Sequence, residues 1–198
     1  MEHSPAAEKR RLRAEVREAR GARPATAIDA LAEPVAARLE ALVDELGARR
    51  IACFLSTPAE PPTRPFVAAC LRRGLAVLLP RPLDGGVLQW VEAGEPGSLL
   101  AERMHPRLRV PEAVGEALSG DPLGGTDLVI APAALVDRGG FRLGWGGGYY
   151  DRALAGRTQP VFALVHDDEV VDRVPREPHD RPVNGIVTPS MTLRIGDR

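Results

Sequence analysis

Apolar and polar positions follow a helical period in the first quarter of the chain. Residues from about 6 to 20 carry apolar side chains three and four positions apart, which predicts an amphipathic helix. A second helical pattern covers residues 26–46, and Gly47 follows it in the position of a C-cap. Pro34 interrupts this pattern, so we expect it to kink the helix or to divide it into two.

After residue 50 the apolar positions form short continuous runs, which are typical of strands buried on both faces. The predicted strands are 51–55, 75–79 (ended by Pro80), 87–91 at an edge of the sheet, 128–131, 161–165 and 186–188 as the last strand. A short helix is expected at 66–73, and residues 92–125 predict no regular element.

Strands separated by helices predict an α/β fold with a mostly parallel sheet flanked by helices on both faces, in an open three-layer Rossmann-like architecture. We expect one domain over residues 1–198, with N-terminal helices at about 6–46 and an α/β core at about 50–190.

Composition narrows the class of protein. The chain has 198 residues, 44% hydrophobic and 27% charged, as expected for a globular domain. Its formal net charge of −1 gives no indication of nucleic acid or of a membrane surface as a partner. The sequence shows no apolar run long enough for a membrane helix and no signal peptide, so we expect a cytoplasmic protein, and we expect it to be a monomer. Cys53 and Cys70 lie in apolar segments and are expected to be reduced and buried.

The most informative segment is the glycine-rich stretch 137–151. Its run Gly146–Gly148 can turn several backbone N–H groups toward a phosphate, and a helix is expected to begin at Tyr149. Arg142 can add a charge-assisted bond, and Asp151 falls in the first helical turn, where it can hold a magnesium ion. No lysine follows the glycines and Tyr149 stands where a third spaced glycine would be needed, so the segment is neither a Walker A loop nor a Rossmann fingerprint.

The sequence Arg-Leu-Gly-Trp-Gly-Gly-Gly-Tyr-Tyr-Asp at 142–151 resembles the signature of the 5-formyltetrahydrofolate cyclo-ligase family, also called 5,10-methenyltetrahydrofolate synthetase. Residues 9–13 resemble its N-terminal K-x-x-L-R segment, and 55–60 with Thr63 resemble its E-x-x-T segment. Residues 165–188, which include His179 and Asp180, resemble its closing segment. The segments occur in the family's order over nearly the whole chain.

The resemblance implies an enzyme that uses ATP and Mg²⁺ to convert 5-formyltetrahydrofolate to 5,10-methenyltetrahydrofolate, with release of ADP and phosphate after phosphorylation of the formyl oxygen. It places ATP on Lys9, Arg10, Arg11, Leu12, Arg13, Arg142, Leu143, Gly144, Trp145, Gly146, Gly147, Gly148, Tyr149 and Tyr150. It places the folate on Leu55, Glu60, Trp145, Gly146, Gly147, Gly148 and Tyr149. The implied catalytic residues are Lys9, Arg142 and Tyr149, and the implied metal ligands are Asp151 and Asp180.

Several of these residues would also be expected in a protein that binds neither ATP nor folate. Lys9 and Arg13 are four residues apart, as in many solvated helix surfaces, and Asp180 beside Arg181 fits a surface pair. Two other functions also fit the predicted fold: a non-catalytic relative that binds nucleotide or RNA, and an enzyme like a sugar-phosphate isomerase or CoA-transferase. Trp145, Glu169 and Ala113 depart from the residues usual in the family, and these departures affect the expected shape of the folate pocket.

Overall fold

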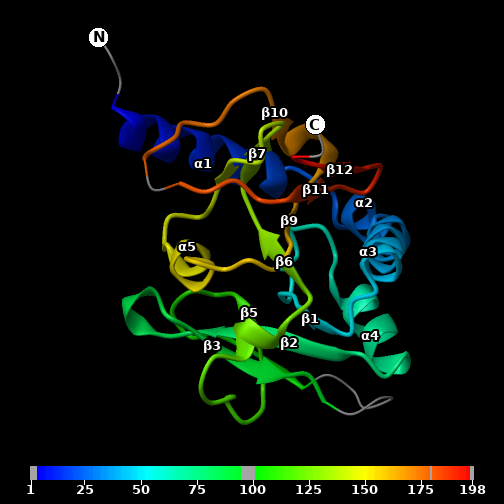
Figure 1. Ribbon diagram of the computed structural model, residues 1–198. Coiled ribbons are helices and arrows are strands. Elements are labelled where there is room, and N and C mark those ends of the chain that lie inside the picture. The colour runs from blue at the N-terminus through cyan, green and yellow to red at the C-terminus, as the bar shows by residue number, and fades with distance from the viewer. Residues whose placement is uncertain (1–3, 95–100, 179, 197–198) are drawn as a thin grey trace.

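A mostly parallel sheet forms the centre of the computed structural model, which describes residues 4–94, 101–178 and 180–196 (Figure 1). Among these residues seven strands cross the sheet in the order β12 (Thr192–Arg194), β11 (Gly185–Val187), β9 (Val161–Leu164), β6 (Leu128–Pro132), β1 (Arg50–Ala52), β2 (Ala76–Pro82) and β3 (Leu88–Glu92). Neighbours from β11 to β2 pair in parallel, whereas β3 and β12 pair antiparallel at the two edges. The predicted sheet and its edge strand near 87–91 are therefore confirmed.

Helices cover both faces of this sheet, as predicted. Helices α3 (Ala32–Leu46) and α4 (Arg64–Arg72) pack on one face, and α5 (Tyr149–Ala153) with the 3-10 turn η2 (Pro122–Gly125) packs on the other. Figure 1 shows α3 and α4 together on one side and α5 on the opposite side. Successive residues of β6 alternate between the two cores: Ile130 packs with the α3–α4 side and Val129 with the α5 side. This alternation explains why the strands are apolar at every position.

Helix α1 (Pro5–Gly21) lies outside these layers, on a small sheet of β10 (Val170–Val171), β7 (Leu135–Asp137) and β8 (Arg142–Leu143). The Ser4 side chain caps its N-terminus by accepting from the amide of Ala7 at 3.3 Å. Val16 packs against Leu135 and Leu143, which carry the start of the glycine-rich segment. The remaining elements are α2 (Ala25–Asp29), the pair β4 (Glu102–Met104) and β5 (Pro111–Ala113), and the 3-10 turns η1 (Asp84–Gly86) and η3 (Asp167–Glu169).

The long helical pattern at 26–46 is divided in two, but the division is not at Pro34. Helix α2 ends at Asp29 and α3 begins at Ala32, so Pro34 lies in the first turn of α3. A proline is tolerated there because the first turn's N–H groups have no acceptor within the helix. Gly47 caps α3 with a φ of 62°, as its position predicted.

The expectation that Pro80 ends the second strand is wrong, because β2 continues to Pro82. In the pairing of β2 with β3, the Val77 carbonyl oxygen accepts from the Ala93 amide, and the Leu83 amide donates to the Val87 carbonyl oxygen. The backbone N–H and C=O groups of odd-numbered residues in β2 therefore point toward β3. The nitrogen of Pro80 therefore faces the β1 side, where the ladder with β2 ends at Leu78. The missing N–H of Pro80 costs no sheet hydrogen bond.

Two further expectations also need correction. The strand at residues 186–188 is not the last one, since β12 pairs with it, and the segment 92–125 contains the strands β4 and β5. These strands are three residues long and carry no period that a sequence pattern could show.

Cys53 and Cys70 are free and buried, as expected, and burial raises the pKa of the Cys70 thiol to about 12. Within the described residues, none of the helices has the length and apolarity needed to cross a membrane.

Candidate active site

A cavity of about 560 Å³ opens where strands β1, β2 and β6 end. Leu55 follows β1, Pro80 lies in the last part of β2, and Pro132 ends β6, and all three line the cavity. The chain leaves β1 toward β2 on one side and returns to β6 on the other side of β1. The cavity thus lies at a switch point of the sheet, beyond the carboxyl ends of the strands, where open α/β sheets bind their ligands.

One half of the cavity is rich in positive charge. Helix α1 contributes Lys9, Arg13 and Arg17 from one face at intervals of four residues, and β8 contributes Arg142. Arg13 donates from Nε to the carbonyl oxygen of Gly144 at 2.7 Å, which joins α1 to the glycine-rich loop. Burial and the nearby charge of Arg17 lower the pKa of Arg13, as expected where cations crowd together.

The glycine-rich loop forms the wall beside these cations. Gly146 has a φ of 94° and Gly148 a φ of 66°, conformations that side-chain-bearing residues rarely adopt. A Cβ added at Gly147 would lie 2.6 Å from the ring of Tyr149, so the loop needs glycine for space as well. The expected helix after the loop is the five-residue α5. Such a short helix has a small dipole, so most of the positive charge here comes from side chains.

Three carboxylates face the same half of the cavity. The Lys9 Nζ lies 2.7 Å from an oxygen of Glu177 and 2.9 Å from an oxygen of Asp180. Burial works to lower the pKa of Lys9, but these two carboxylates outweigh it and raise the pKa above its ordinary value. Arg142 pairs with Asp151, whose side chain is 60% exposed. These carboxylates supply oxygen donors of the kind Mg²⁺ prefers, although the described residues hold no group of three or more acidic, His or Cys side chains arranged as a metal site.

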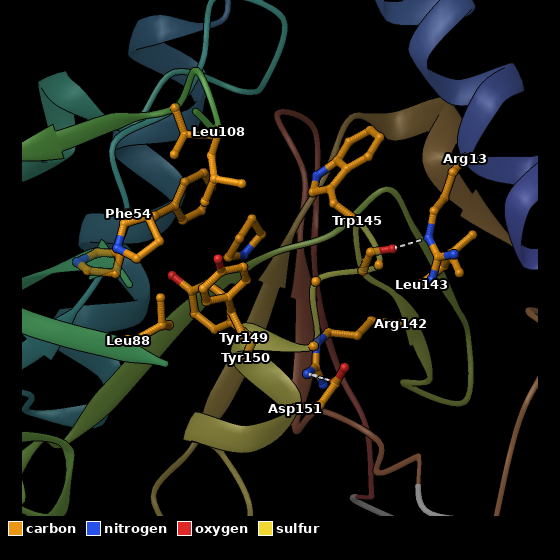
Figure 2. Close-up of a pocket in the computed structure, with 18 of the residues that line it drawn as sticks. Arg13, Phe54, Leu88, Leu108, Arg142, Leu143, Trp145, Tyr149, Tyr150 and Asp151 are labelled. Atoms are coloured by element: carbon orange, nitrogen blue, oxygen red, sulfur yellow. Dashed lines mark hydrogen bonds and ion pairs between the residues drawn. The ribbon is translucent and has the colours of Figure 1, made fainter. Parts of the chain in front are cut away.

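The other half of the cavity is apolar and aromatic. Figure 2 shows Phe54, Leu88 and Leu108 on one side, opposite Arg13 and Arg142, with Tyr149 and Tyr150 between them. The Tyr149 hydroxyl donates to the carbonyl oxygen of Leu83 at 3.1 Å. This half can accept a flat, largely apolar ring system.

Two polar groups are set into this apolar wall. Glu60 is 8% exposed, and its Oε2 accepts from the amide and hydroxyl of Thr57 at 2.8 and 3.0 Å. The buried hydroxyl of Tyr150 has no hydrogen-bond partner among the described residues. Burial raises the pKa of Tyr150 well above its ordinary value, which keeps this hydroxyl protonated. A carboxylate and a neutral hydroxyl are therefore positioned to bond a polar ring edge.

The structure brings together most of the residues that the sequence singled out. Those that line the cavity are Lys9, Arg13, Leu55, Glu60, Arg142, Leu143, Gly144, Trp145, Gly146, Gly147, Gly148, Tyr149, Tyr150, Asp151 and Asp180. Arg10 and Arg11 are exposed, and Leu12 packs with the hydrophobic cluster of Val16, so these three residues lie outside the cavity lining.

Sequence reasoning missed several lining residues. Arg17 could have been found, because it extends the four-residue spacing of Lys9 and Arg13. Glu177 is three residues before Asp180, but a lone acidic residue in a loop carries no signal. The wall formed by Leu108, Val110 and Pro111 comes from the segment in which the sequence predicted no element. His166 lies outside the cavity lining, and its ring nitrogen Nε2 bonds the carbonyl oxygen of Ala59 at 3.1 Å.

Comparison with known proteins shows the family of this chain. The sequence model of the 5-formyltetrahydrofolate cyclo-ligase family matches residues 5–189. A 5-formyltetrahydrofolate cyclo-ligase of Mycolicibacterium smegmatis is 36% identical over 152 residues, which are 73% of this chain and 76% of that protein. The enzyme of the same name from Escherichia coli is 35% identical over 152 residues, or 72% of this chain and 79% of that protein.

Solved structures share the fold. The 5,10-methenyltetrahydrofolate synthetase of Aquifex aeolicus superposes with a TM-score of 0.78 at 24% identity, covering 96% of this chain and 94% of that one. The synthetase of Mycoplasma pneumoniae superposes with a TM-score of 0.69 at 18% identity, covering 90% and 97%. The family match extends from helix α1 through β11, and so includes every element that lines the cavity. On this evidence the chain belongs to the 5-formyltetrahydrofolate cyclo-ligase family.

Proposed function

We propose that this chain converts 5-formyltetrahydrofolate to 5,10-methenyltetrahydrofolate with consumption of ATP and release of ADP and phosphate. The observation that carries the proposal is a single cavity with two chemically different halves. Cations and a glycine-rich loop in one half suit a triphosphate, and an apolar half with a buried carboxylate suits a pterin. Family membership supplies the identity of both substrates.

In the apolar half, Glu60 is the group that can recognise the pterin. Its Oε2 is occupied by Thr57, which leaves Oε1 available to accept from the ring's N–H groups. The Tyr150 hydroxyl, without a protein partner among the described residues, can bond a second polar atom of the ring. Trp145 and Tyr149 offer aromatic surface between the two halves for packing on the ring face. These contacts would orient the formyl group toward the cationic half.

The formyl group must be activated, because the formyl carbon of an amide is a poor electrophile. Phosphorylation of the formyl oxygen makes this carbon more electrophilic and turns the oxygen into a leaving group. The formyl oxygen attacks the terminal phosphorus of ATP; the new O–P bond forms as the bond to the ADP oxygen breaks. Lys9, Arg13 and Arg142 line the cavity where the negative charge of this transfer would be neutralised. Backbone N–H groups of the loop at Gly146–Gly148 can add further donors.

Ring closure follows from the resulting imino-phosphate. Nitrogen 10 of the folate attacks the activated carbon, the carbon–oxygen bond to phosphate breaks, and nitrogen 10 loses its proton to give the methenyl product. The contribution of the protein to this step is positioning, since both reacting atoms belong to one bound molecule. No covalent intermediate with a side chain is required.

Asp151 and Asp180 are the residues that would hold Mg²⁺, and Glu177 offers a third carboxylate in the same half of the cavity. The donor set fits, because Mg²⁺ is commonly bound by one or two carboxylates together with substrate phosphates rather than by a complete protein cage. When bound, the ion would neutralise charge on the terminal phosphates. Asp151 is paired with Arg142, and Asp180 is paired with Lys9.

The proposed reaction is tested by measuring the absorbance of the methenyl product as it forms, with and without ATP. An ATP requirement also separates it from the isomerase-like and CoA-transferase-like alternatives, and an absence of product with both substrates and Mg²⁺ would overturn it.

Asp151→Ala tests the metal assignment. We expect a rate at least about 100-fold lower in the presence of Mg²⁺, with the fold intact because the side chain is largely exposed. Asp121→Ala is the matched control: it breaks a comparable surface pair, with Arg157, away from the cavity and should leave turnover unchanged. Wild-type turnover in Asp151→Ala would remove Asp151 from the site.

A further inference from the structure

Arg20, in the last turn of α1, is a charged residue buried in the interior: it is 4% exposed. Its Nε and Nη2 donate to the two carboxylate oxygens of Glu169 at 2.8 and 2.7 Å, and Nη2 also donates to the carbonyl oxygen of Ala133 at 2.9 Å. A two-point contact of this kind fixes the plane of the guanidinium as well as its position. Arg20 is therefore held more rigidly than an ordinary helix-surface arginine.

Glu169 is itself firmly anchored. Its Oε2 accepts from the amide of His166 at 2.9 Å, and its Oε1 accepts from Arg23 at 3.1 Å. Burial works to raise the pKa of Glu169, but the hydrogen bonds and charge of Arg20 outweigh it and lower the pKa. The anchor is ionised at neutral pH and lies outside the cavity lining, so it serves to hold Arg20.

The remaining nitrogen of Arg20 lies near Glu60, which lines the apolar half of the cavity. Nη1 is buried, has no hydrogen-bond partner among the described residues, and lies 3.7 Å from Oε1 of Glu60. At this distance the contact is electrostatic rather than a hydrogen bond. Because the other oxygen of Glu60 is bonded by Thr57, the carboxylate is held from both sides while Oε1 keeps its capacity to accept from a ligand.

The same guanidinium also lies over Trp145, with its carbon 5.0 Å from the centre of the ring. Trp145 lines the cavity on the glycine-rich loop, whereas Glu60 lines it on the loop after β1. Arg20 contacts both residues without lining the cavity itself. It thereby connects two walls that are otherwise formed by separate segments.

We propose that Arg20 is the positioning residue of the folate site: it sets the placement of Glu60 relative to Trp145 and thus the affinity for the reduced folate. The identity of this ligand rests on the proposed function. Arg20 acts through the two residues and does not touch the substrate. Without the charge of Arg20, Glu60 would lose the one ion pair it makes among the described residues, and Trp145 would keep Arg17, 5.4 Å from its ring centre, but lose the guanidinium that joins it to Glu60.

Arg20→Lys tests the proposal, because lysine keeps the charge but cannot make the two-point contact or present a planar face to Trp145. We expect KM for 5-formyltetrahydrofolate and its Kd by calorimetry without ATP to rise roughly 10-fold to 100-fold, as for the loss of a hydrogen bond to a charged group. KM for ATP should stay near the wild-type value. Arg157→Lys is the matched control, since Arg157 makes a two-point contact with Asp121 outside the cavity lining and should not alter folate affinity.

A double-mutant cycle separates positioning from general loss of structure. In a Glu60→Gln background, Arg20→Lys should weaken folate binding much less than it does in the wild type, because both changes remove the same contact. If Arg20→Lys does not fold, Glu169→Gln takes its place. This variant keeps Arg20 but removes the negative charge of Glu169, which anchors it. We then expect a smaller rise in the KM for 5-formyltetrahydrofolate.

The outcomes distinguish the two proposals. A wild-type protein that forms no methenyl product overturns the proposed function. An active wild type whose folate KM and Kd are unchanged in folded Arg20→Lys, or in Glu169→Gln where Arg20→Lys does not fold, overturns the role of Arg20 alone. Strictly additive effects of Arg20→Lys and Glu60→Gln would do the same.

Discussion

Replacement of Lys9 by methionine removes one positive charge from the phosphate half of the cavity at nearly constant volume. The Lys9 side chain is 11% exposed, and its ammonium contacts Glu177 at 2.7 Å and Asp180 at 2.9 Å. The folded pKa is raised, so the stabilising charge is complete below the unfolded pKa of lysine and would be lost only as the pH rises through the folded value. At neutral pH the wild-type residue is fully charged.

The change should affect catalysis more than stability. The Glu177 side chain is 41% exposed, so solvent screens its ion pair with Lys9. The Asp180 side chain is 20% exposed, so its ion pair with Lys9 is screened less. Together the two pairs contribute about 1–2 kcal/mol to the free energy of unfolding. For a chain of this size that lowers Tm by roughly 2–8 °C. Loss of one group that stabilises the transferring phosphoryl group should lower kcat by about 100-fold to 1,000-fold.

Steady-state formation of the methenyl product at saturating folate and ATP, together with thermal unfolding, measures both effects. Arg11→Met is the control, because Arg11 lies on the same helix and pairs with Glu15 at the exposed surface, outside the cavity lining. It should leave kcat unchanged. A folded Lys9→Met variant with wild-type kcat and KM for ATP would refute the assignment of Lys9 to the phosphate half.

Three further changes test the loop, the sheet and the pH response. Gly148→Ala, at a φ of +66° and with the new Cβ 2.8 Å from Arg152, should lower kcat/KM for ATP by up to about 100-fold, and an unchanged value would show that the loop tolerates a side chain. Gly185→Ala would place a Cβ 2.2 Å from the Phe162 ring and should cost about 1–3 kcal/mol in chemical denaturation, which a wild-type midpoint would contradict. Burial lowers the pKa of His166, so its contribution to stability is complete above the unfolded pKa of about 6.5 and is lost as the pH falls below it. The urea midpoint should therefore drop between about pH 7.5 and pH 5, and a His166→Gln variant should show a shallower drop.

The sequence could predict those elements whose spacing of apolar residues indicates which of their faces are buried. The runs at 51–55, 128–131 and 161–165 are apolar at every position because both faces of those strands are covered, and the structure places strands in each of them. The glycine-rich loop was also visible in sequence, since its backbone conformations at Gly146 and Gly148 demand glycine locally.

Only the tertiary structure decided how these parts meet. Lys9 and Asp180 are 171 residues apart, and Arg20 and Glu169 are 149 residues apart, so no local pattern could pair them. The helix period showed which face of α1 is charged, but whether that face meets solvent or a cavity depends on where the helix docks. The apolar wall of Leu108, Val110 and Pro111 comes from a segment without a period and acquires its role by lying opposite the glycine-rich loop. Periodicity records the burial of a single element, whereas a site is formed by contacts between elements, and those are fixed by the packing of the whole chain.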